Sequence, residues 1–321
     1  MIFERTNLIT CVGVEHDLSM LPHFLRHYLD LGIKPERMFV ILNANSEDSP
    51  SLTDAKNILK EHGISSPTEW IAPYTSGDMW AQRRDIQSNY CDLNDWVISA
   101  DVDELHTYPI PLEAFLEWCE EQTIDCVQGV MIDRLASEGQ LSSVNSSPAL
   151  AEQFPVRAEV ALSIAGKGAW HDRTGTVKLM VMKAHVLPGI GGHRPWKGQK
   201  ANHIYAAPLE YFTSVERPEF RFAVPTQVEH FHWTKTLPDR LRIRLSTPGV
   251  SEAGAEYGQK QIDHIDANNG INLNQVALFT PIKEKWQDSV ARMRKEGRRV
   301  LLRTRITALW ARIMGRIRKF L

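Results

Sequence analysis

The first 135 residues alternate between two patterns of hydrophobic positions. Apolar runs of strand length occupy residues 8–14, 38–42, 69–72, 96–100 and 126–132. Apolar residues recur at helical spacing over residues 21–29, 52–59 and 112–119, and a polar helix is predicted over 79–90. Gly32 and Gly63 follow the first two helices, where glycine commonly ends a helix. Strands alternating with helices predict an α/β fold with a doubly wound, mostly parallel sheet.

The pattern changes after this first part of the chain. Residues 137–225 are richer in Gly, Pro, Ser and His, with one clear strand candidate at 177–186 and a glycine-rich loop at 189–195. Long loops in a compact domain often bind ligands. We therefore predict one catalytic domain over residues 1–280, built from a half over about 1–135 and a second half, an insertion, over about 136–280.

A last segment, residues 281–321, reads as a basic amphipathic helix. Its apolar positions keep helical spacing: Leu302, Ile306, Leu309, Trp310, Ile313, Ile317 and Phe320. The 39 residues of 283–321 contain thirteen Lys/Arg and three acids, a charge of +10 in a chain whose net charge is −2. The remaining residues therefore carry −12. This asymmetry predicts a charged partner for the tail.

Composition restricts the class of protein further. Hydrophobic content of 43% and charged content of 24% are ordinary for a globular protein. The four cysteines lack metal-ligand spacing and are typical of reduced residues in a cytosolic protein. Glu4 and Arg5 precede a short apolar run, which is not the pattern of a signal peptide. We therefore expect a cytoplasmic location.

The strongest chemical motif is Asp-Val-Asp-Glu at residues 101–104, directly after the apolar run 96–100. Asp101 and Asp103 are two residues apart, so they share a face if the strand continues. Two carboxylates on one face suit Mg²⁺ or Mn²⁺, particularly with phosphate oxygens. Ligands in open α/β sheets lie at the carboxyl ends of strands. The alternative is a surface turn with three solvated acids.

Together these features resemble the GT-A glycosyltransferases, and more narrowly the family 2-like bacterial enzymes with a D-x-D-E motif. The resemblance covers about residues 5–245 and is carried by Glu15, by residues 29–33 and 43–48, by 95–104, and by 230–233. It implies a nucleotide-sugar donor, a divalent metal ion on the donor's diphosphate, and inversion at the anomeric carbon. It also implies a metal site at Asp101 and Asp103, in which the second acid ligates the ion directly and the first often touches the donor's ribose or a water on the metal. Many family members carry an acid where this chain has Asn43.

The resemblance also points to residues outside the acid motif. His230 and His232 share a strand face and match the late histidine that completes the metal shell in many GT-A enzymes, which favours Mn²⁺ over Mg²⁺. Candidates for donor binding are Asn43, Asn45, Asp48, Arg83, Arg84, Asp101 and His193. The alternatives are an asparagine-rich turn for residues 43–48, a solvated helix face for the two arginines and a turn histidine.

The acceptor hydroxyl needs a proton acceptor during attack. Asp133 is the first candidate and Glu229 the second, although either can simply pair with an arginine. Glu104 either holds its loop or faces the acceptor. The sequence therefore predicts a metal-dependent, inverting glycosyltransferase acting on a glycan or lipid-linked acceptor of the cell envelope. The alternatives are a nucleotidyltransferase and a catalytically silent nucleotide- or carbohydrate-binding module.

The tail has three interpretations. It packs onto the domain as a core helix, it binds nucleic acid, or it lies on an anionic membrane surface. Thirteen cations are hard to bury, and the acidic body argues against nucleic acid. We therefore favour peripheral contact with the inner face of the membrane.

Overall fold

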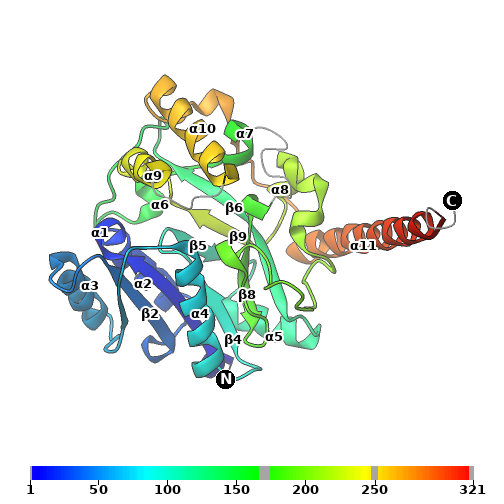
Figure 1. Cartoon of the computed structure of the whole chain (residues 1–321), viewed down its shortest axis with the longest axis horizontal. Coiled ribbons are helices and arrows are strands. Elements are labelled where there is room, and N and C mark those ends of the chain that lie inside the picture. Colours follow the sequence, from blue (N-terminus) through cyan, green and yellow to red (C-terminus); the bar gives the residue numbers. More distant parts are fainter. Residues whose placement is uncertain (1, 166–173, 247–251, 318–321) are drawn as a thin grey trace.

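A computed structural model describes residues 2–165, 174–246 and 252–317, and its strands join in one sheet (Figure 1). The main path has the order β10-β7-β6-β8-β4-β1-β2-β3, with β9 beside β6 and β5 beside β9. The strands are β1 (Thr6–Gly13), β2 (Met38–Ala44), β3 (Thr68–Ile71), β4 (Trp96–Ser99), β5 (Glu104–Thr107), β6 (Cys126–Leu135), β7 (Val156–Glu159), β8 (Val177–Lys183), β9 (Gln227–His230) and β10 (Ala277–Leu278).

Strand directions confirm the predicted sheet. β3, β2, β1 and β4 pair in parallel, as successive βαβ units require. β8 runs antiparallel to both β4 and β6, so β6 regains the direction of β4. Across the described sheet β5, β7 and β8 oppose the other seven strands. The first half is therefore parallel, and the second half is mixed.

Helices cover both faces of the parallel half, which makes it doubly wound. The α-helices are α1 (Val14–Asp17), α2 (Leu21–Asp30), α3 (Pro50–Glu61), α4 (Ser76–Tyr90), α5 (Leu112–Glu121), α6 (Leu150–Gln153), α7 (Ala161–Ala165), α8 (Pro218–Arg221), α9 (Leu237–Ser246), α10 (Glu252–Asn268) and α11 (Trp286–Ile317). Alternate residues of β1 point to opposite faces: Leu8 packs in the core under α2, α3 and α5, whereas Ile9 packs under α4.

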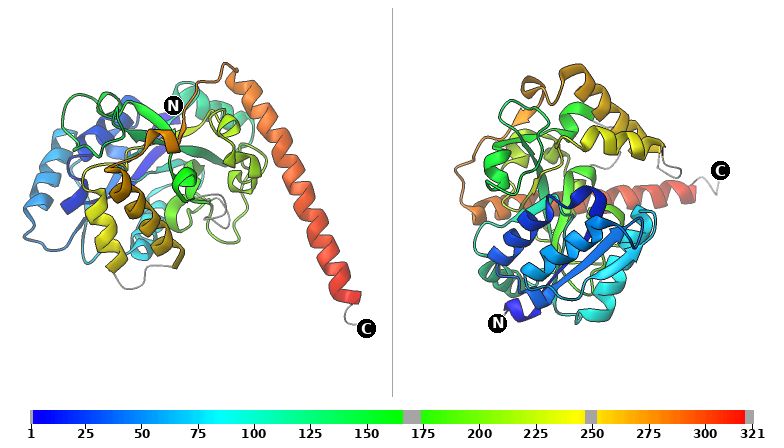
Figure 2. Two further views of the ribbon diagram at one scale, coloured as in Figure 1. Left: turned by 90° about the horizontal axis from the view of Figure 1, so that it is seen from above. Right: turned by 90° about the vertical axis from the view of Figure 1, so that its left-hand side faces the viewer.

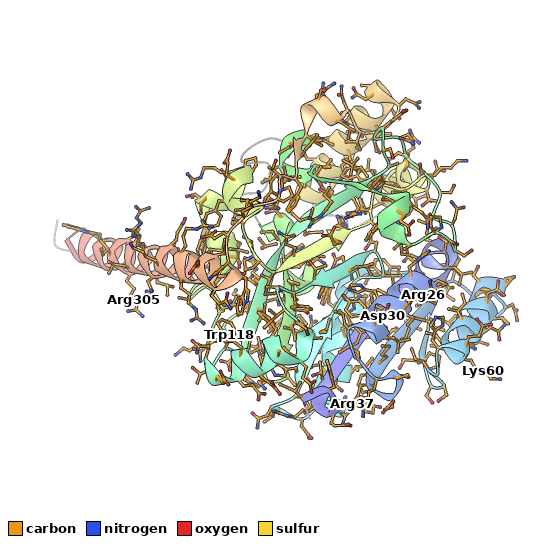
Figure 3. All side chains as sticks on the ribbon, turned by 180° about the vertical axis from the view of Figure 1, so that it is seen from behind. Arg26, Asp30, Arg37, Lys60, Trp118 and Arg305 are labelled. Carbon is orange, nitrogen blue, oxygen red and sulfur yellow. The ribbon has the colours of Figure 1, made fainter. Side chains whose placement is uncertain are left out.

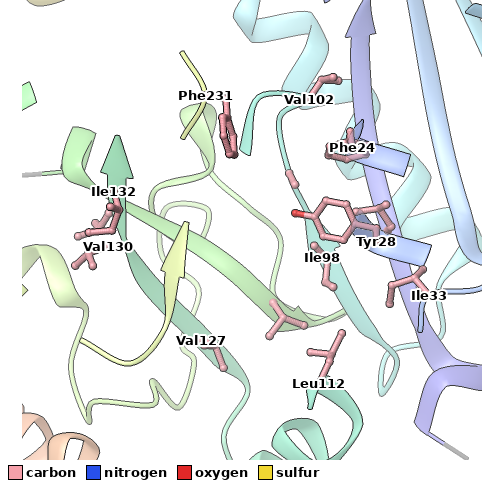
Figure 4. Close-up of a cluster of buried hydrophobic side chains, with 14 of the residues drawn as sticks. Phe24, Tyr28, Ile33, Ile98, Val102, Leu112, Val127, Val130, Ile132 and Phe231 are labelled. Atoms are coloured by element: carbon pink, nitrogen blue, oxygen red, sulfur yellow. The ribbon is translucent and has the colours of Figure 1, made fainter. Parts of the chain in front are cut away.

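The main core lies between the sheet and the first of these faces (Figure 4). Phe24 and Tyr28 of α2 are fully buried, with ring centroids 4.7 Å apart. The hydroxyl of Tyr28 donates a hydrogen bond to the carbonyl of Glu104, 3.1 Å away. This bond ties α2 to the first residue of β5, which is also the last residue of the acid motif. All four cysteines are free.

The second half contains elements that periodicity did not predict. Strands β7 and β10 and helices α9 and α10 lie outside the predicted runs, as does β5 in the first half. A smaller core joins the end of β6 and β7 to α9 and α10, through residues such as Trp233, Leu241 and Ile262. The insertion therefore has a core of its own beside the main sheet. The domain boundaries drawn from the sequence stay a prediction.

Helix α11 confirms the predicted C-terminal helix, and it projects from the body (Figure 2). Its first turns dock through Val290 and Met293, both buried, and through Trp286, whose ring lies 5.0 Å from that of Trp118. Gly297 allows the helix to approach the body this closely, because a Cβ there would lie 2.0 Å from the carbonyl oxygen of Tyr205. Beyond it the helix leaves the body (Figure 3). No described helix has the apolar length needed to cross a membrane.

Candidate metal centre

The sheet brings residues far apart in the chain to the carboxyl end of β4. Strand β9 lies between β5 and β6, with His230 opposite Glu104 on one side and Asp133 on the other. The backbone N–H of Phe231 donates to the carbonyl of Asp103 at 2.8 Å, which extends this pairing past β9. The turn after β4 and the segment after β9 therefore face each other.

Asp103, His230 and His232 form a compact group of metal-ligand type. One ligand atom from each lies within 4.8 Å of the others. Asp103 Oδ2 is 3.5 Å from His232 Nδ1 and 3.9 Å from His230 Nε2, and the two imidazole rings stack 5.0 Å apart. Side-chain exposures of 18%, 15% and 20% leave each residue mostly buried, yet reachable. Ligand atoms bound at about 2.1 Å from one ion would lie about 3–4 Å apart.

One carboxylate and two imidazoles fit a borderline divalent ion. Mn²⁺, Fe²⁺ and Zn²⁺ accept this donor set more readily than Mg²⁺, which prefers oxygen ligands alone. Asp101 is not a member of the group. Both acids were predicted at the metal site, with the second as the direct ligand, and the structure brings the second to the histidines. The roles of the two acids stay a prediction.

Asp133 fixes the orientation of His230. Its Oδ1 accepts hydrogen bonds from Nδ1 of His230 and Nε1 of Trp233, each at 2.9 Å, and its Oδ2 accepts from the backbone N–H of Val160 at 2.9 Å. In the neutral ring, Nδ1 of His230 donates to Asp133, and Nε2 carries the lone pair and faces Asp103. Burial opposes charge on His230, but Asp133 and Asp103 outweigh it and raise the pKa, so a metal ion would displace the proton on Nε2. Carboxylates of this kind commonly orient metal-binding histidines.

The charges of the group support one another. Burial acts against the charged form of Asp103, but hydrogen bonding and charge from His232 and His230 hold its pKa well below its usual range. Burial likewise opposes charge on Asp133, and the bond from His230 outweighs it and lowers the pKa. Both carboxylates are therefore ionised at neutral pH. Burial lowers the pKa of His232, which favours the neutral imidazole that binds metals.

Asp101 and Glu104 belong to a separate charge cluster. Asp101 accepts from Arg83 at 2.8 Å and from Lys178 at 2.9 Å, and Lys178 also lies 2.7 Å from Glu104. Despite burial, Lys178 and Arg83 lower the pKa of Asp101 to about 2. Burial raises the pKa of Glu104. Both cations are almost fully buried, which fixes their geometry.

The other proton-acceptor candidate is also engaged. Glu229 pairs with Arg134 at 3.1 Å and with Arg157 at 2.5 Å. This is the arginine pairing that the sequence left open for Glu229, whereas Asp133 pairs with a histidine.

The predicted donor-binding residues lie at three places: at the end of β2 and in the loop after it, in the charge cluster of Asp101, and where α4 meets the loop near residues 188–196. Asn43 is buried at the end of β2, where its amide donates to the carbonyls of Trp70 and Ala72 at 3.0 and 2.9 Å. Asn45 and Asp48 are exposed in the loop that follows. Asn43 therefore secures the carboxyl ends of β2 and β3, and the next residues remain accessible.

Arg84 contacts the loop near residues 188–196, and His193 belongs to this loop. Arg84 donates to the carbonyl of Pro188 at 3.3 Å and lies over the ring of Trp196 at 4.0 Å. His193 Nδ1 lies 2.7 Å from the carbonyl oxygen of Val177. These contacts anchor the loop to α4 and β8, and a donor role for either residue stays a prediction.

A cavity of about 110 Å³ adjoins Asp103 and reveals residues that the sequence reasoning missed. Asp17 from α1, Lys235 after β9 and Arg240 of α9 line it together with Asp103. Burial raises the pKa of Asp17, whose Oδ1 is 3.7 Å from Arg240. Asp17 follows β1 at a carboxyl edge of the parallel sheet, so the strand-end rule was the signal that could have found it.

A second, larger groove begins at the same lysine. It has a volume of about 650 Å³ and runs along α9 and α10. Its lining residues are mostly polar: Gln140, Leu141, Lys235, Pro238, Arg242, Ile265, Asp266 and Asn269. Lys235 lines both spaces, so the groove approaches the cavity that holds Asp103.

Comparisons with known proteins give a limited result. No family model and no curated protein matches the chain. Among solved structures it is similar to the mannosyltransferase PcManGT of Pyrobaculum calidifontis, in complex with GDP-Man and Mn²⁺ (12% identity, TM-score 0.30), covering 40% of this chain and 35% of that one. It is similar also to TarS 1–349 of S. aureus (11% identity, TM-score 0.32), covering 83% and 74%.

Proposed function

We propose that this chain is a metal-dependent, inverting glycosyltransferase that moves a sugar from a nucleotide-sugar donor to a glycan or lipid-linked acceptor. The observation that carries the proposal is the group of Asp103, His230 and His232 at the carboxyl end of β4. It lies where open α/β sheets bind their ligands, beside the parallel half of the sheet. The resemblance of the motif at 101–104 to family 2-like enzymes points the same way.

One group of side chains would bind the metal ion and the donor, and another would accept the proton of the acceptor hydroxyl. Asp103, His230 and His232 would hold Mn²⁺, which would neutralise charge on the diphosphate leaving group. Asp133 keeps Nε2 of His230 free for this purpose. Arg83 and Lys178 keep Asp101 ionised and fixed, so that its remaining lone pairs can accept from a donor hydroxyl. The exposed loop at 45–48 would contact the nucleoside.

Asp133, Glu229 and Glu104 each pair with a histidine or a cation at 3.1 Å or less. Asp17 has a looser pairing, 3.7 Å from Arg240, so we assign proton acceptance to Asp17. Asp17 shares a cavity with Asp103, and its raised pKa makes it a better base than an ordinary surface carboxylate. The polar groove along α9 and α10 opens at Lys235 and would admit the acceptor. Carboxylate, amide and guanidinium groups in its lining suit the hydroxyls of a glycan.

The first experiment measures donor binding and product release. A panel of nucleotide sugars is screened by thermal shift with Mn²⁺ and with EDTA, for the native chain and for Asp103→Asn. We expect a stabilising donor that needs Mn²⁺, with no response in Asp103→Asn. Equal stabilisation in EDTA would overturn metal dependence.

Turnover of the selected donor separates the alternatives. Release of free nucleoside diphosphate supports glycosyl transfer, and release of pyrophosphate supports nucleotidyl transfer instead. Binding with no turnover against a panel of glycan and lipid-linked acceptors supports the silent module.

The second experiment tests Asp17. Asp17→Asn should lower kcat by about 10²–10⁴-fold, the range of general-base catalysis, while donor affinity stays near the native value. Asp239→Asn on exposed α9 is the matched control and should keep native kcat. If Asp17→Asn retains native kcat, another group accepts the proton.

A further inference from the structure

The outer part of α11 presents an uncovered apolar stripe. Leu302, Ile306 and Trp310 have exposed fractions of 60%, 47% and 61%. They are spaced four residues apart, so they lie along one side of the helix. The side chains of Leu309, Ile313 and Ile317 are outside the described set, and Phe320 lies outside the described residues.

The stripe is uncovered because the helix leaves the body after its docked first turns. Residues 302–307 are all exposed, whereas Met293 and Gly297 are buried. The part from 302 to 317 is about 24 Å long at about 1.5 Å per residue. In proteins most helical stability comes from packing of the apolar side of the helix, and Leu302, Ile306 and Trp310 have no such packing within the described residues.

The charge of this segment identifies the chemistry of the missing surface. Residues 297–321 contain eight Lys/Arg and no acid. Arg303 and Arg305 are exposed and flank the stripe of Leu302, Ile306 and Trp310 at about 20° and 60° from its edges, at about 100° per residue. Arginines beside an apolar stripe that includes a tryptophan are typical of a helix lying in the interface of an anionic bilayer.

We propose that the outer part of α11, residues 302–317, docks on an anionic lipid surface with Leu302, Ile306 and Trp310 entering the interface. Leu302, Ile306 and Trp310 bury apolar area, and Arg303 and Arg305 pair with lipid phosphates. A second copy of the same helix is a poorer occupant, because eight cations on each chain repel. Nucleic acid would attract the cations but would leave the apolar side chains in water.

Vesicle co-sedimentation tests the proposal. The intact chain should sediment with phosphatidylcholine vesicles that contain phosphatidylglycerol, and much less with phosphatidylcholine alone. High salt should weaken the binding, because screening shortens the range of attraction. A chain ending at Leu301 should stay in the supernatant while keeping the native melting temperature. An intact chain that fails to sediment at low salt overturns the proposal.

Three variants separate the contributions. Leu302→Ser with Ile306→Ser and Trp310→Ser removes the apolar stripe and should abolish binding. Arg303→Gln with Arg305→Gln should weaken binding about 25-fold, at about fivefold for each arginine near an anionic surface. Thr304→Ser with Thr307→Ser changes exposed positions on the same helix and should bind as the native chain does.

Sedimentation velocity without lipid tests whether a second copy of the chain covers the apolar stripe instead. A truncation-sensitive dimer of the intact chain, together with no vesicle binding, would show that the stripe pairs with a second copy and would overturn the lipid proposal. A monomer that binds anionic vesicles supports it.

Discussion

Asp133 Oδ1 lies 2.9 Å from His230 Nδ1, and this bond joins the end of β6 to the end of β9. The two residues are 97 positions apart in the chain. The same carboxylate accepts hydrogen bonds from Trp233 and from the backbone of Val160, and these bonds fix the position of the carboxylate beside His230. Asp133 is therefore a positioning residue for His230 in the proposed metal site.

Asp133→Asn should weaken Mn²⁺ binding by about 10–100-fold, the usual effect of losing a carboxylate behind a metal-binding histidine. Titration calorimetry with Mn²⁺ measures the change. Glu159→Gln is the matched control: it removes another buried carboxylate, which accepts from the backbone of Leu162 and Ser163 and contacts no histidine. Native Mn²⁺ affinity in Asp133→Asn would contradict the assignment.

The metal preference follows from the donor set. Two imidazoles beside Asp103 should make Mn²⁺ bind more tightly than Mg²⁺, because Mg²⁺ prefers oxygen ligands. Calorimetric titrations with each ion test this. Replacing both His230 and His232 by Gln should remove most of the preference. Equal affinity of the native chain for the two ions would be inconsistent with histidine ligation.

Lys178 should be a large contributor to stability. It is 6% exposed and lies within 3 Å of both Asp101 and Glu104. Lys178→Met leaves Glu104 without a charged partner, so the free energy of unfolding should fall by about 3–5 kcal/mol. Adding Glu104→Gln should restore much of this loss, since the uncompensated charge disappears. Denaturant unfolding measures the free energy of unfolding of the single and double variants. An identical loss of stability in both would show that Lys178 does not stabilise the fold by pairing with Glu104.

Stability should fall in mild acid because of His106. Burial lowers the pKa of this fully buried residue from 6.5 to about 3. Between these two pH values the histidine is protonated in the unfolded chain and neutral in the folded chain. Stability is therefore lost as pH falls below 6.5, by about 1.4 kcal/mol per pH unit, until the folded pKa is reached. His106→Leu should reduce this slope by one proton. Val130→Ala, a core control, should lower stability without changing the slope.

The first half of the fold was predictable from the sequence because each of its elements buries one periodic face. Strand β1 alternates between two cores, and α2 shows its apolar stripe every three to four residues. The acid motif was found for the same reason, since it directly follows a buried run. Helix α11 was predictable too, but its apolar stripe did not reveal that Gly297 marks where the helix leaves the body.

The composition of the site was decided only by the tertiary structure. Asp101 and Asp103 look equivalent in the sequence, yet a turn directs Asp103 to the histidines of β9 while buried Arg83 and Lys178 hold Asp101. The different surroundings of Asp101 and Asp103 result from pairing between strands that are over 100 residues apart in the chain. The spacing of residues within the motif does not predict such pairing. For the same reason Asp133 read as a base and Asp17 went unnoticed: a carboxylate's role depends on which donors and cations the fold brings to it, and the sequence gives only its position on an element.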